Sequence, residues 1–142
     1  MNNKLYILDT DHVSLFQRQH PVVVQHLAGI NAKTLAVTII TVDEQVRGRL
    51  IVIKRANSME KLIQAYGDLQ ASVAYFNKIQ VLPFDKAAYA YYDTLRQQKI
   101  RIGSQDLRIA SIVLSIKGVL VTRNWKDFGK VPDLTLEDWS IS

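Results

Sequence analysis

The sequence predicts an α/β fold, a three-layer α/β/α domain in which helices cover both faces of a mainly parallel central sheet. Short runs of apolar and β-branched residues recur along the chain, and segments with helical spacing of apolar residues separate them. Strands that are joined through helices form parallel sheets, because each connecting helix packs back on the sheet. With 142 residues, one compact domain, 1–142, accounts for the whole chain.

The first half of the chain contains two expected strands and a pair of helices. Residues 5–8 form a continuous apolar run, typical of a strand buried on both faces. Helical features over 13–28 and a turn at 29–33 lead to a second, β-branched strand at 35–40. Helices at 41–56 and 58–77 should form a hairpin. Core packing is expected for the apolar stripe of the second helix, and a partner surface is the alternative; the stripe comprises Leu62, Ile63, Tyr66, Leu69, Val73 and Phe76.

The second half adds three expected strands and two helices. Residues 81–84 form a strand that Pro83 assigns to a sheet edge, because proline cannot donate a ladder hydrogen bond. Asp85 is the expected N-cap of a helix through residue 98, and Ser104 that of a helix ending before Gly118. Strands are expected at 119–122 and 134–136.

Composition narrows the class of partner and the compartment. The formal net charge is +5 and the pI is about 9.5, which favours a polyanionic partner. The absence of cysteine excludes disulfides and thiolate metal sites and fits a reducing cytoplasm. The apolar run at 5–8 is too short for a signal peptide or a membrane span. We therefore expect a cytoplasmic protein without a membrane partner.

Acidic side chains follow the expected strands, where ligands bind in open α/β sheets. Asp9 and Asp11 follow the first strand, Asp43 and Glu44 the second, and Asp85 the third; Asn124 and Asp127 follow the fourth. Asp106 opens the helix that leads into the fourth strand. Carboxylates that converge on one point repel one another unless a cation neutralises them. Mg²⁺, with Mn²⁺ as a substitute, suits such oxygen ligands.

Structural explanations compete with this interpretation. Thr41 and Glu44 match a capping box, which would account for both residues. An acid at the position of Asp106 is favoured by the helix dipole, and Asp43 is expected to be solvated. The histidines His12, His20 and His26 lack a zinc-binding spacing and are expected at the surface or in packing.

Five blocks in order along the chain resemble the PIN domain, in particular the VapC-type toxins of bacterial toxin-antitoxin pairs. The blocks are YILDTD (6–11), TIITVDEQVRG (38–48), the segment 81–88, IGSQDLRIASIVLSIKGVLVTRNWKDF (102–128) and DLTLEDW (133–139). Two positions depart from the family pattern. Asn is commoner where this chain has Asp11, and many PIN domains carry a fourth acid where it has Asn124.

The resemblance implies a magnesium-dependent endoribonuclease that is neutralised by a cognate antitoxin and forms a homodimer. Asp9 and Asp106 would hold the metal, Glu44 would complete its ligand shell or orient a water, and Asn124 would position water or phosphate. Because Asn124 lacks charge, one metal is the safer expectation, unless Asp127 compensates. Contacts to the RNA substrate are expected from Thr10, Thr122, Arg108 and Arg123, and further backbone contacts from Arg47, Arg49 and Lys126.

Two other functions stay open. DTDHV at 9–13 fits the D-x-D-x-[TV] motif of haloacid dehalogenase-like phosphotransferases, in which Asp9 would be the nucleophile and Asp11 an acid/base. That chemistry also requires a lysine and a late acidic pair, and the residues after Val121 offer no such pair. A PIN-like binding module without full activity is the non-enzymatic alternative, and Asn124 is the residue that suggests it.

Overall fold

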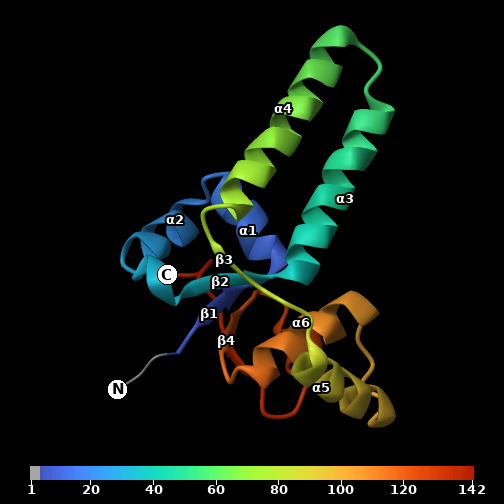
Figure 1. Ribbon diagram of the computed structural model, residues 1–142. Helices are drawn as coiled ribbons and strands as arrows, with labels where there is room; N and C mark the ends of the chain where they lie inside the picture. The colour runs from blue at the N-terminus through green and yellow to red at the C-terminus, as the bar shows by residue number, and fades with distance from the viewer. Residues whose placement is uncertain (1–3) are drawn as a thin grey trace.

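The structure, a computed structural model, describes residues 4–142 (Figure 1). Its strands are β1 (Tyr6–Leu8), β2 (Leu35–Thr38), β3 (Gln80–Leu82), β4 (Val119–Val121) and β5 (Thr135–Glu137). Its helices are α1 (Thr10–Gln17), α2 (Pro21–Ala28), α3 (Ile39–Arg55), α4 (Met59–Phe76), α5 (Lys86–Gln97), α6 (Ser104–Ser115) and α7 (Trp125–Phe128), with a 3₁₀ turn at Ala32–Thr34.

The five strands form one sheet in the order β3-β2-β1-β4-β5, and every neighbouring pair is parallel. This confirms the predicted α/β class. β3 lies at the edge of the sheet, as predicted, but it ends at Leu82, so Pro83 follows the strand and is not part of it. The strand order reverses between β1 and β4, since the chain first runs outward through β2 and β3 and then returns to the other side of β1.

Alternate residues of each strand build two separate cores, one on each face of the sheet. Ile7 of β1 and Leu120 of β4 pack with the buried residues of α5 and α6. The adjacent residues Leu8 and Val121 pack on the opposite face, with Val13 of α1 and with Trp139 near the C-terminus. The period of two along a strand thus gives the three layers of the fold.

Helix boundaries differ from the expected ones where a cap was misread. The expected helix over 13–28 is two helices, because Gln19 adopts a left-handed conformation (φ 59°) and Pro21 starts a new helix. Helix α3 starts at Ile39 and is capped by Thr38, whose side chain accepts the amide hydrogen of Thr41. Gly103, not Ser104, is the N-cap of α6. Asp85 caps α5 as predicted.

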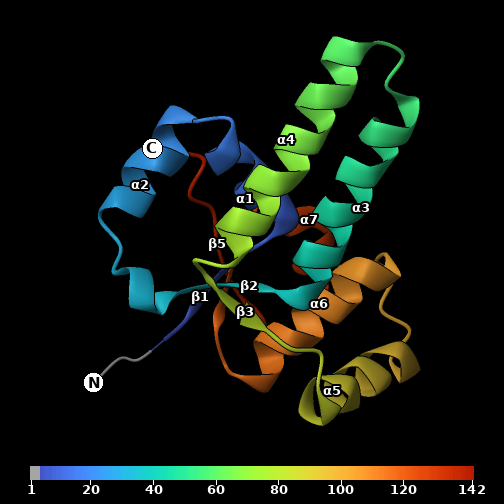
Figure 2. The same cartoon turned by 45° about the horizontal axis from the view of Figure 1, so that its top comes forward.

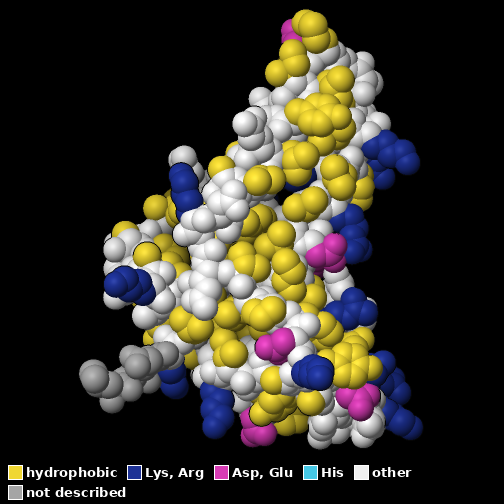
Figure 3. Space-filling model, viewed as in Figure 1, with side chains coloured by type: hydrophobic (Ala, Val, Ile, Leu, Met, Phe, Trp, Pro, Cys, Tyr) yellow, Lys and Arg dark blue, Asp and Glu magenta, His cyan; other side chains and the backbone are white. Residues whose placement is uncertain are grey.

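The α3–α4 hairpin was predicted, but the expected burial of its apolar stripe is wrong. The hairpin projects from the rest of the molecule, and apolar side chains cover much of its visible face (Figures 1 and 3). Ile63 and Tyr66 are 66% and 55% exposed, whereas Phe76, at the base of the hairpin, is buried. Helical periodicity shows which face is apolar and leaves open whether the rest of the chain covers it.

Within residues 4–142, no helix combines the length and the apolar character that crossing a membrane requires.

Candidate active site

A pocket of about 450 Å³ opens at the carboxyl ends of β1 and β4, where the strand order reverses. This is the position at which open α/β sheets bind ligands. Parts of α1, α3, α6 and α7 surround it, and Figure 2 shows α7 beside α1 and the base of α3. The lining residues are Asp9, Thr10, Asp11, Glu44, Asp106, Ile109, Arg123, Asn124 and Phe128.

Asp9 is fixed at the junction between β1 and α1. Its backbone N–H donates to the carbonyl of Val121 in β4 (3.0 Å), which extends the β1–β4 pairing by one residue. Its side chain caps α1, with Oδ1 accepting the backbone N–H of His12 (2.7 Å). Only 6% of Asp9 is exposed. The carboxylate is therefore a buried acid beside the pocket, held by both its backbone and its side chain.

Glu44 projects from α3 toward α1. The hydroxyl of Thr10 donates to Glu44 Oε1 (2.7 Å), and Thr10 Oγ1 lies 3.0 Å from the hydroxyl oxygen of Thr41. Because the Thr10 proton points at a carboxylate, the Thr41 hydroxyl donates to Thr10. The predicted capping box is wrong, since Thr38 is the cap and Thr41 lies within α3. Glu44 instead takes part in a contact between helices at the pocket.

Asp106 lies in the first turn of α6 and faces the other acids. Burial is the largest cause that raises the pKa of its carboxyl to about 6. The negative charges of Glu44, Asp9 and Asp127 raise the pKa in the same direction. The four carboxyl groups therefore share one region, which the positions of their residues along the sequence predicted.

Asn124 lines the pocket, but its amide is engaged within its own helix. Its Oδ1 accepts the backbone N–H of Asp127 (3.3 Å), which caps α7. Its Nδ2 donates to Asp127 Oδ2 (3.2 Å). Asn124 thus orients Asp127, and the charge of Asp127 reaches Asp106. Asp127 is therefore close enough for its charge to act on Asp106, although it does not line the pocket.

Asp11 and Arg123 form an ion pair across the mouth of the pocket. Arg123 Nε donates to Asp11 Oδ2 at 2.7 Å, and both side chains are partly exposed. Arg123 is the basic residue among those that line the pocket, and no lysine is among them. The phosphotransferase alternative requires a lysine and a late acidic pair, and the pocket lining contains no lysine.

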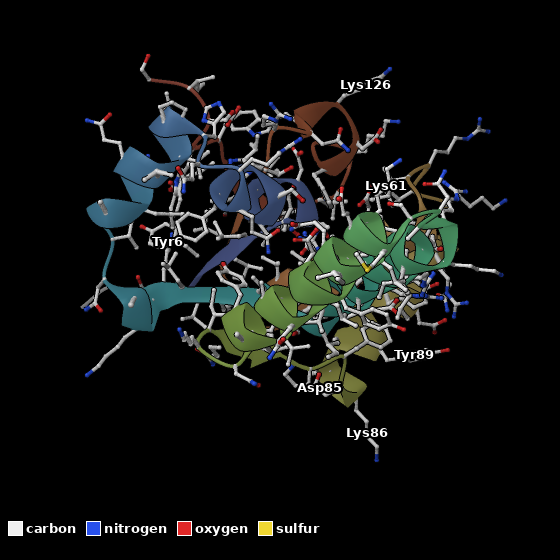
Figure 4. The ribbon with its side chains drawn as sticks, turned by 90° about the horizontal axis from the view of Figure 1, so that it is seen from above. Tyr6, Lys61, Asp85, Lys86, Tyr89 and Lys126 are labelled. Carbon is white, nitrogen blue, oxygen red and sulfur yellow. The ribbon has the colours of Figure 1, made fainter. Side chains whose placement is uncertain are left out.

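The other basic residues expected near the RNA lie away from the pocket lining. Arg108 donates to Gln105 Oε1 (2.7 Å) and lies over the ring of Tyr92, with its Cζ 5.5 Å from the centroid. Arg47 pairs with Asp43 (2.6 Å), and Arg49 donates to Ser72 Oγ (3.0 Å). Lys126 projects outward from α7 (Figure 4).

Thr122 also lies outside the lining. It is fully buried, and its Oγ1 accepts the backbone N–H of Asn124 (2.9 Å). Its hydroxyl shapes the turn after β4 and does not face a substrate, so the expected contact with the scissile phosphate does not fit its burial.

His12 belongs to the site, although the sequence pattern did not single it out. It is completely buried, and its Nδ1 lies 3.2 Å from Asp9 Oδ1. The other two histidines have structural roles: His20 caps α2, and His26 stacks on Trp139 with the ring centroids 4.3 Å apart. A histidine three residues after an acid, in the first turn of a helix, was the signal available in the sequence.

The donor set suits a hard divalent cation. It offers carboxylate oxygens without cysteine, and His12 has both ring nitrogens engaged within the protein. Within residues 4–142, no three acidic or histidine side chains are already gathered closely enough to enclose an ion. Mg²⁺ keeps several waters and needs few direct protein ligands, so it fits an open cluster of this kind better than Zn²⁺ does.

Comparison with known proteins points to one family. The chain is 29% identical over 140 residues to Ribonuclease VapC1 of Haemophilus influenzae, covering 96% of this chain and 98% of that protein. It is also 29% identical over 141 residues to Ribonuclease VapC2 of Rickettsia felis, covering 95% and 98%. No family model matches the chain.

Solved structures agree with these relatives. The crystal structure of VapBC2 from Rickettsia felis, bound to a DNA fragment from its promoter, matches with a TM-score of 0.75 and 28% identity, over 95% of this chain and 98% of that chain. The chain is therefore similar to VapC ribonucleases over nearly its whole length. DNA-bound VapBC from Salmonella typhimurium shares the fold, with a TM-score of 0.79 at 21% identity over 96% and 98% of the two chains. The resemblance drawn from the sequence blocks is confirmed. The pocket at the carboxyl ends of β1 and β4 is the candidate active site of this chain.

Proposed function

We propose that this VapC-like chain is a magnesium-dependent endoribonuclease that hydrolyses RNA phosphodiesters. The observation that carries the proposal is the convergence of Asp9, Glu44, Asp106 and Asp127, which raises the pKa of the Asp106 carboxyl to about 6. A bound cation would neutralise these carboxylates and remove their mutual repulsion. Two relatives that carry the name ribonuclease, each matched over 98% of its length, support the reaction class.

The carboxylates have different parts in this proposal. Asp9, Asp106 and Glu44 would hold the metal. Bound Mg²⁺ would supply a Lewis acid that polarises a phosphoryl oxygen and activates a water for in-line attack. Thr10, which donates to Glu44, fixes the direction of that carboxylate. Asn124 holds Asp127 at the edge of the cluster.

Arg123 is the residue that we propose for contact with the RNA backbone. Its guanidinium lies at the pocket and is 47% exposed, so it can reach a phosphate beside the acids. A pocket lined by carboxylates repels a polyanion, and a cation at its rim reduces that repulsion. The net charge of +5 adds a long-range attraction for RNA.

The experiment is cleavage of purified RNA by the wild type and by Asp9→Asn, with Mg²⁺ and with a chelator, followed by mapping of the new ends. Asp133→Asn is the matched control, because it removes an acid at an exposed position outside the pocket. Discrete Mg²⁺-dependent cuts by the wild type and by the control, but not by Asp9→Asn, are expected. A folded wild type that binds Mg²⁺ but makes no cuts would favour a binding module without activity.

Transfer RNA is the first fraction to test. A relative from Salmonella typhimurium, 23% identical over 138 residues, is named a tRNA(fMet)-specific endonuclease. Single-stranded loops are the parts of RNA whose bases a protein can reach, so cuts are expected in loops.

We also propose that a cognate antitoxin neutralises this chain in the cytoplasm. The structures from Rickettsia felis and Haemophilus influenzae are of VapBC assemblies. On this chain, the exposed apolar face of the α3–α4 hairpin is the kind of surface that a protein partner covers.

A further inference from the structure

His12 is a buried polar side chain with both ring nitrogens engaged. Its exposed fraction is 0%, and it lies one helical turn after Asp9 at the start of α1. Nδ1 lies 3.2 Å from Asp9 Oδ1, and Nε2 lies 3.3 Å from the backbone nitrogen of Trp139. The imidazole therefore joins an acid of the pocket to the C-terminal segment.

These contacts fix the tautomer of the ring. A backbone N–H can only donate, so Nε2 accepts the hydrogen of Trp139 and carries no proton. The ring proton is then on Nδ1, which donates to Asp9 Oδ1. Asp138 Oδ1 is 3.7 Å from Nε2, beyond hydrogen-bond distance, and it already accepts from the backbone N–H (2.8 Å) and the hydroxyl (2.5 Å) of Ser140.

The two oxygens of the Asp9 carboxylate therefore differ, because both hydrogen bonds from His12 go to Oδ1. Oδ1 accepts from the backbone N–H of His12 at 2.7 Å and from its Nδ1–H at 3.2 Å. Two donors on one oxygen prevent rotation of the carboxylate, and Oδ2 is left to face the pocket. Such hydrogen bonds from outside the ligand set orient a metal-binding carboxylate before the metal arrives.

Trp139 gives the imidazole a rigid support. The indole is 1% exposed, packs on Tyr6 with centroids 5.3 Å apart, and donates from Nε1 to Glu137 Oε1 (2.9 Å). Its backbone N–H is therefore held in place by β1 on one side and by β5 on the other. The position of His12 follows from that of Trp139.

We propose that His12 is a positioning residue. It holds the Asp9 carboxylate with Oδ2 presented to the metal, and Trp139 holds His12 in turn. This inference rests on the proposed metal-dependent function. It assigns a role to a side chain that touches neither metal nor substrate.

Two substitutions separate the two hydrogen bonds. His12→Asn places an amide N–H near the position of Nδ1 and keeps the donor to Asp9. His12→Gln places its amide near the position of Nε2, so it keeps the acceptor for Trp139 and loses the donor to Asp9. Both variants lose the ring and differ in which contact survives; asparagine is one methylene shorter than glutamine, so lost packing alone would harm His12→Asn more.

The measurements are Mg²⁺ binding by calorimetry, Mn²⁺ binding by electron paramagnetic resonance, and cleavage rate against Mg²⁺ concentration. We expect His12→Asn to bind within about threefold of the wild type, and His12→Gln to bind about 10- to 100-fold more weakly. Excess Mg²⁺ should restore cleavage by His12→Gln. Loss of packing alone would instead weaken His12→Asn more, without rescue by the metal.

A measurement on the wild type covers the case in which the variants do not fold. Nitrogen-15 NMR should show His12 protonated on Nδ1, and Mg²⁺ should shift that resonance more than those of His20 and His26. A proton on Nε2, or a His12→Gln variant that binds Mg²⁺ like the wild type, would overturn the positioning role and leave the nuclease proposal intact. A folded wild type that binds neither cation would instead overturn the metal-dependent function, and the inference with it.

Discussion

At the scale of single residues, the acidic side chains of the pocket repel one another in the metal-free protein, and this repulsion lowers its stability. Asp106 shows this cost, because burial and three neighbouring carboxylates raise its pKa to about 6. In the unfolded chain the same carboxyl titrates near its ordinary pKa of about 3.9. Between about pH 4 and pH 6 the Asp106 carboxyl is therefore protonated to a greater extent in the folded protein than in the unfolded chain. The contribution of Asp106 to stability becomes less favourable as the pH rises through that window, and its full cost is present above it.

Asp106→Asn should therefore stabilise the metal-free protein at about pH 7, because it removes the repulsion while keeping the shape of the side chain. The gain should shrink as the pH falls from about 6 to about 4, where wild-type Asp106 is protonated in the folded state. Urea unfolding with a chelator, at several pH values, measures the difference. Asp133→Asn, outside the pocket, should show no such trend, and equal stabilities of wild type and Asp106→Asn at every pH would contradict the charge argument.

At the scale of elements, the start of α3 decides where Glu44 lies. Thr38 ends β2 and caps α3, so the helix begins two residues earlier than the sequence pattern indicates. Thr41 then falls within the helix and faces Thr10, and Glu44 follows one turn later. The buried hydroxyl of Thr38 therefore supports the pocket from a distance.

Thr38→Val tests this cap, since valine keeps the shape of threonine and removes the acceptor. Loss of a threonine N-cap costs about 1 kcal/mol, and here it also leaves the buried amide N–H of Thr41 without its partner. Urea unfolding should show a loss of about that size or somewhat more. Ser58→Ala removes the exposed cap of α4 and should cost less. A Thr38→Val protein as stable as the wild type would mean that α3 needs no side-chain cap.

The helix boundaries show which structural features the sequence patterns could predict. Asp85 and Ser58 precede clear helical periodicity, and the structure has helices starting directly after both. Thr38 was missed because 35–40 reads as one continuous β-branched run, and the chain turns into a helix inside it. Hairpin exposure was missed because periodicity describes one helix at a time, whereas burial depends on what the rest of the chain can cover.

At the scale of the whole molecule, the acids could be found from the sequence, whereas the contact of His12 with Trp139 could not. Parallel strands bring their carboxyl ends to one edge of the sheet, so an acid that directly follows a strand is predicted to lie at that edge. The role of His12 depends on Trp139, which lies 127 residues away, and no local pattern joins the two. The order of the strands creates that contact, because β5 runs beside β4 and brings the C-terminal segment back to α1.

Gly118 and Gly67 test how closely β1 and β4 are packed beside the candidate active site. A Cβ at Gly118, just before β4, would lie 2.5 Å from Ile7 Cδ1 and 3.1 Å from the carbonyl oxygen of Leu5. Ile7 is fully buried in β1, so it has little room to move. At Gly67, within α4, a Cβ would meet nothing within 4 Å. The same substitution should therefore have opposite effects at the two positions.

Gly118→Ala should destabilise the protein by about 1–3 kcal/mol, the usual cost of overpacking a core. Gly67→Ala should stabilise it by about 0.5–1 kcal/mol, because alanine loses less backbone entropy than glycine in a helix. Urea unfolding measures both. Since β1 leads directly into Asp9, Gly118→Ala should also weaken Mg²⁺ binding, while Gly67→Ala should leave it unchanged. A Gly118→Ala variant with wild-type stability and metal affinity would mean that β1 can shift without moving the acid that follows it.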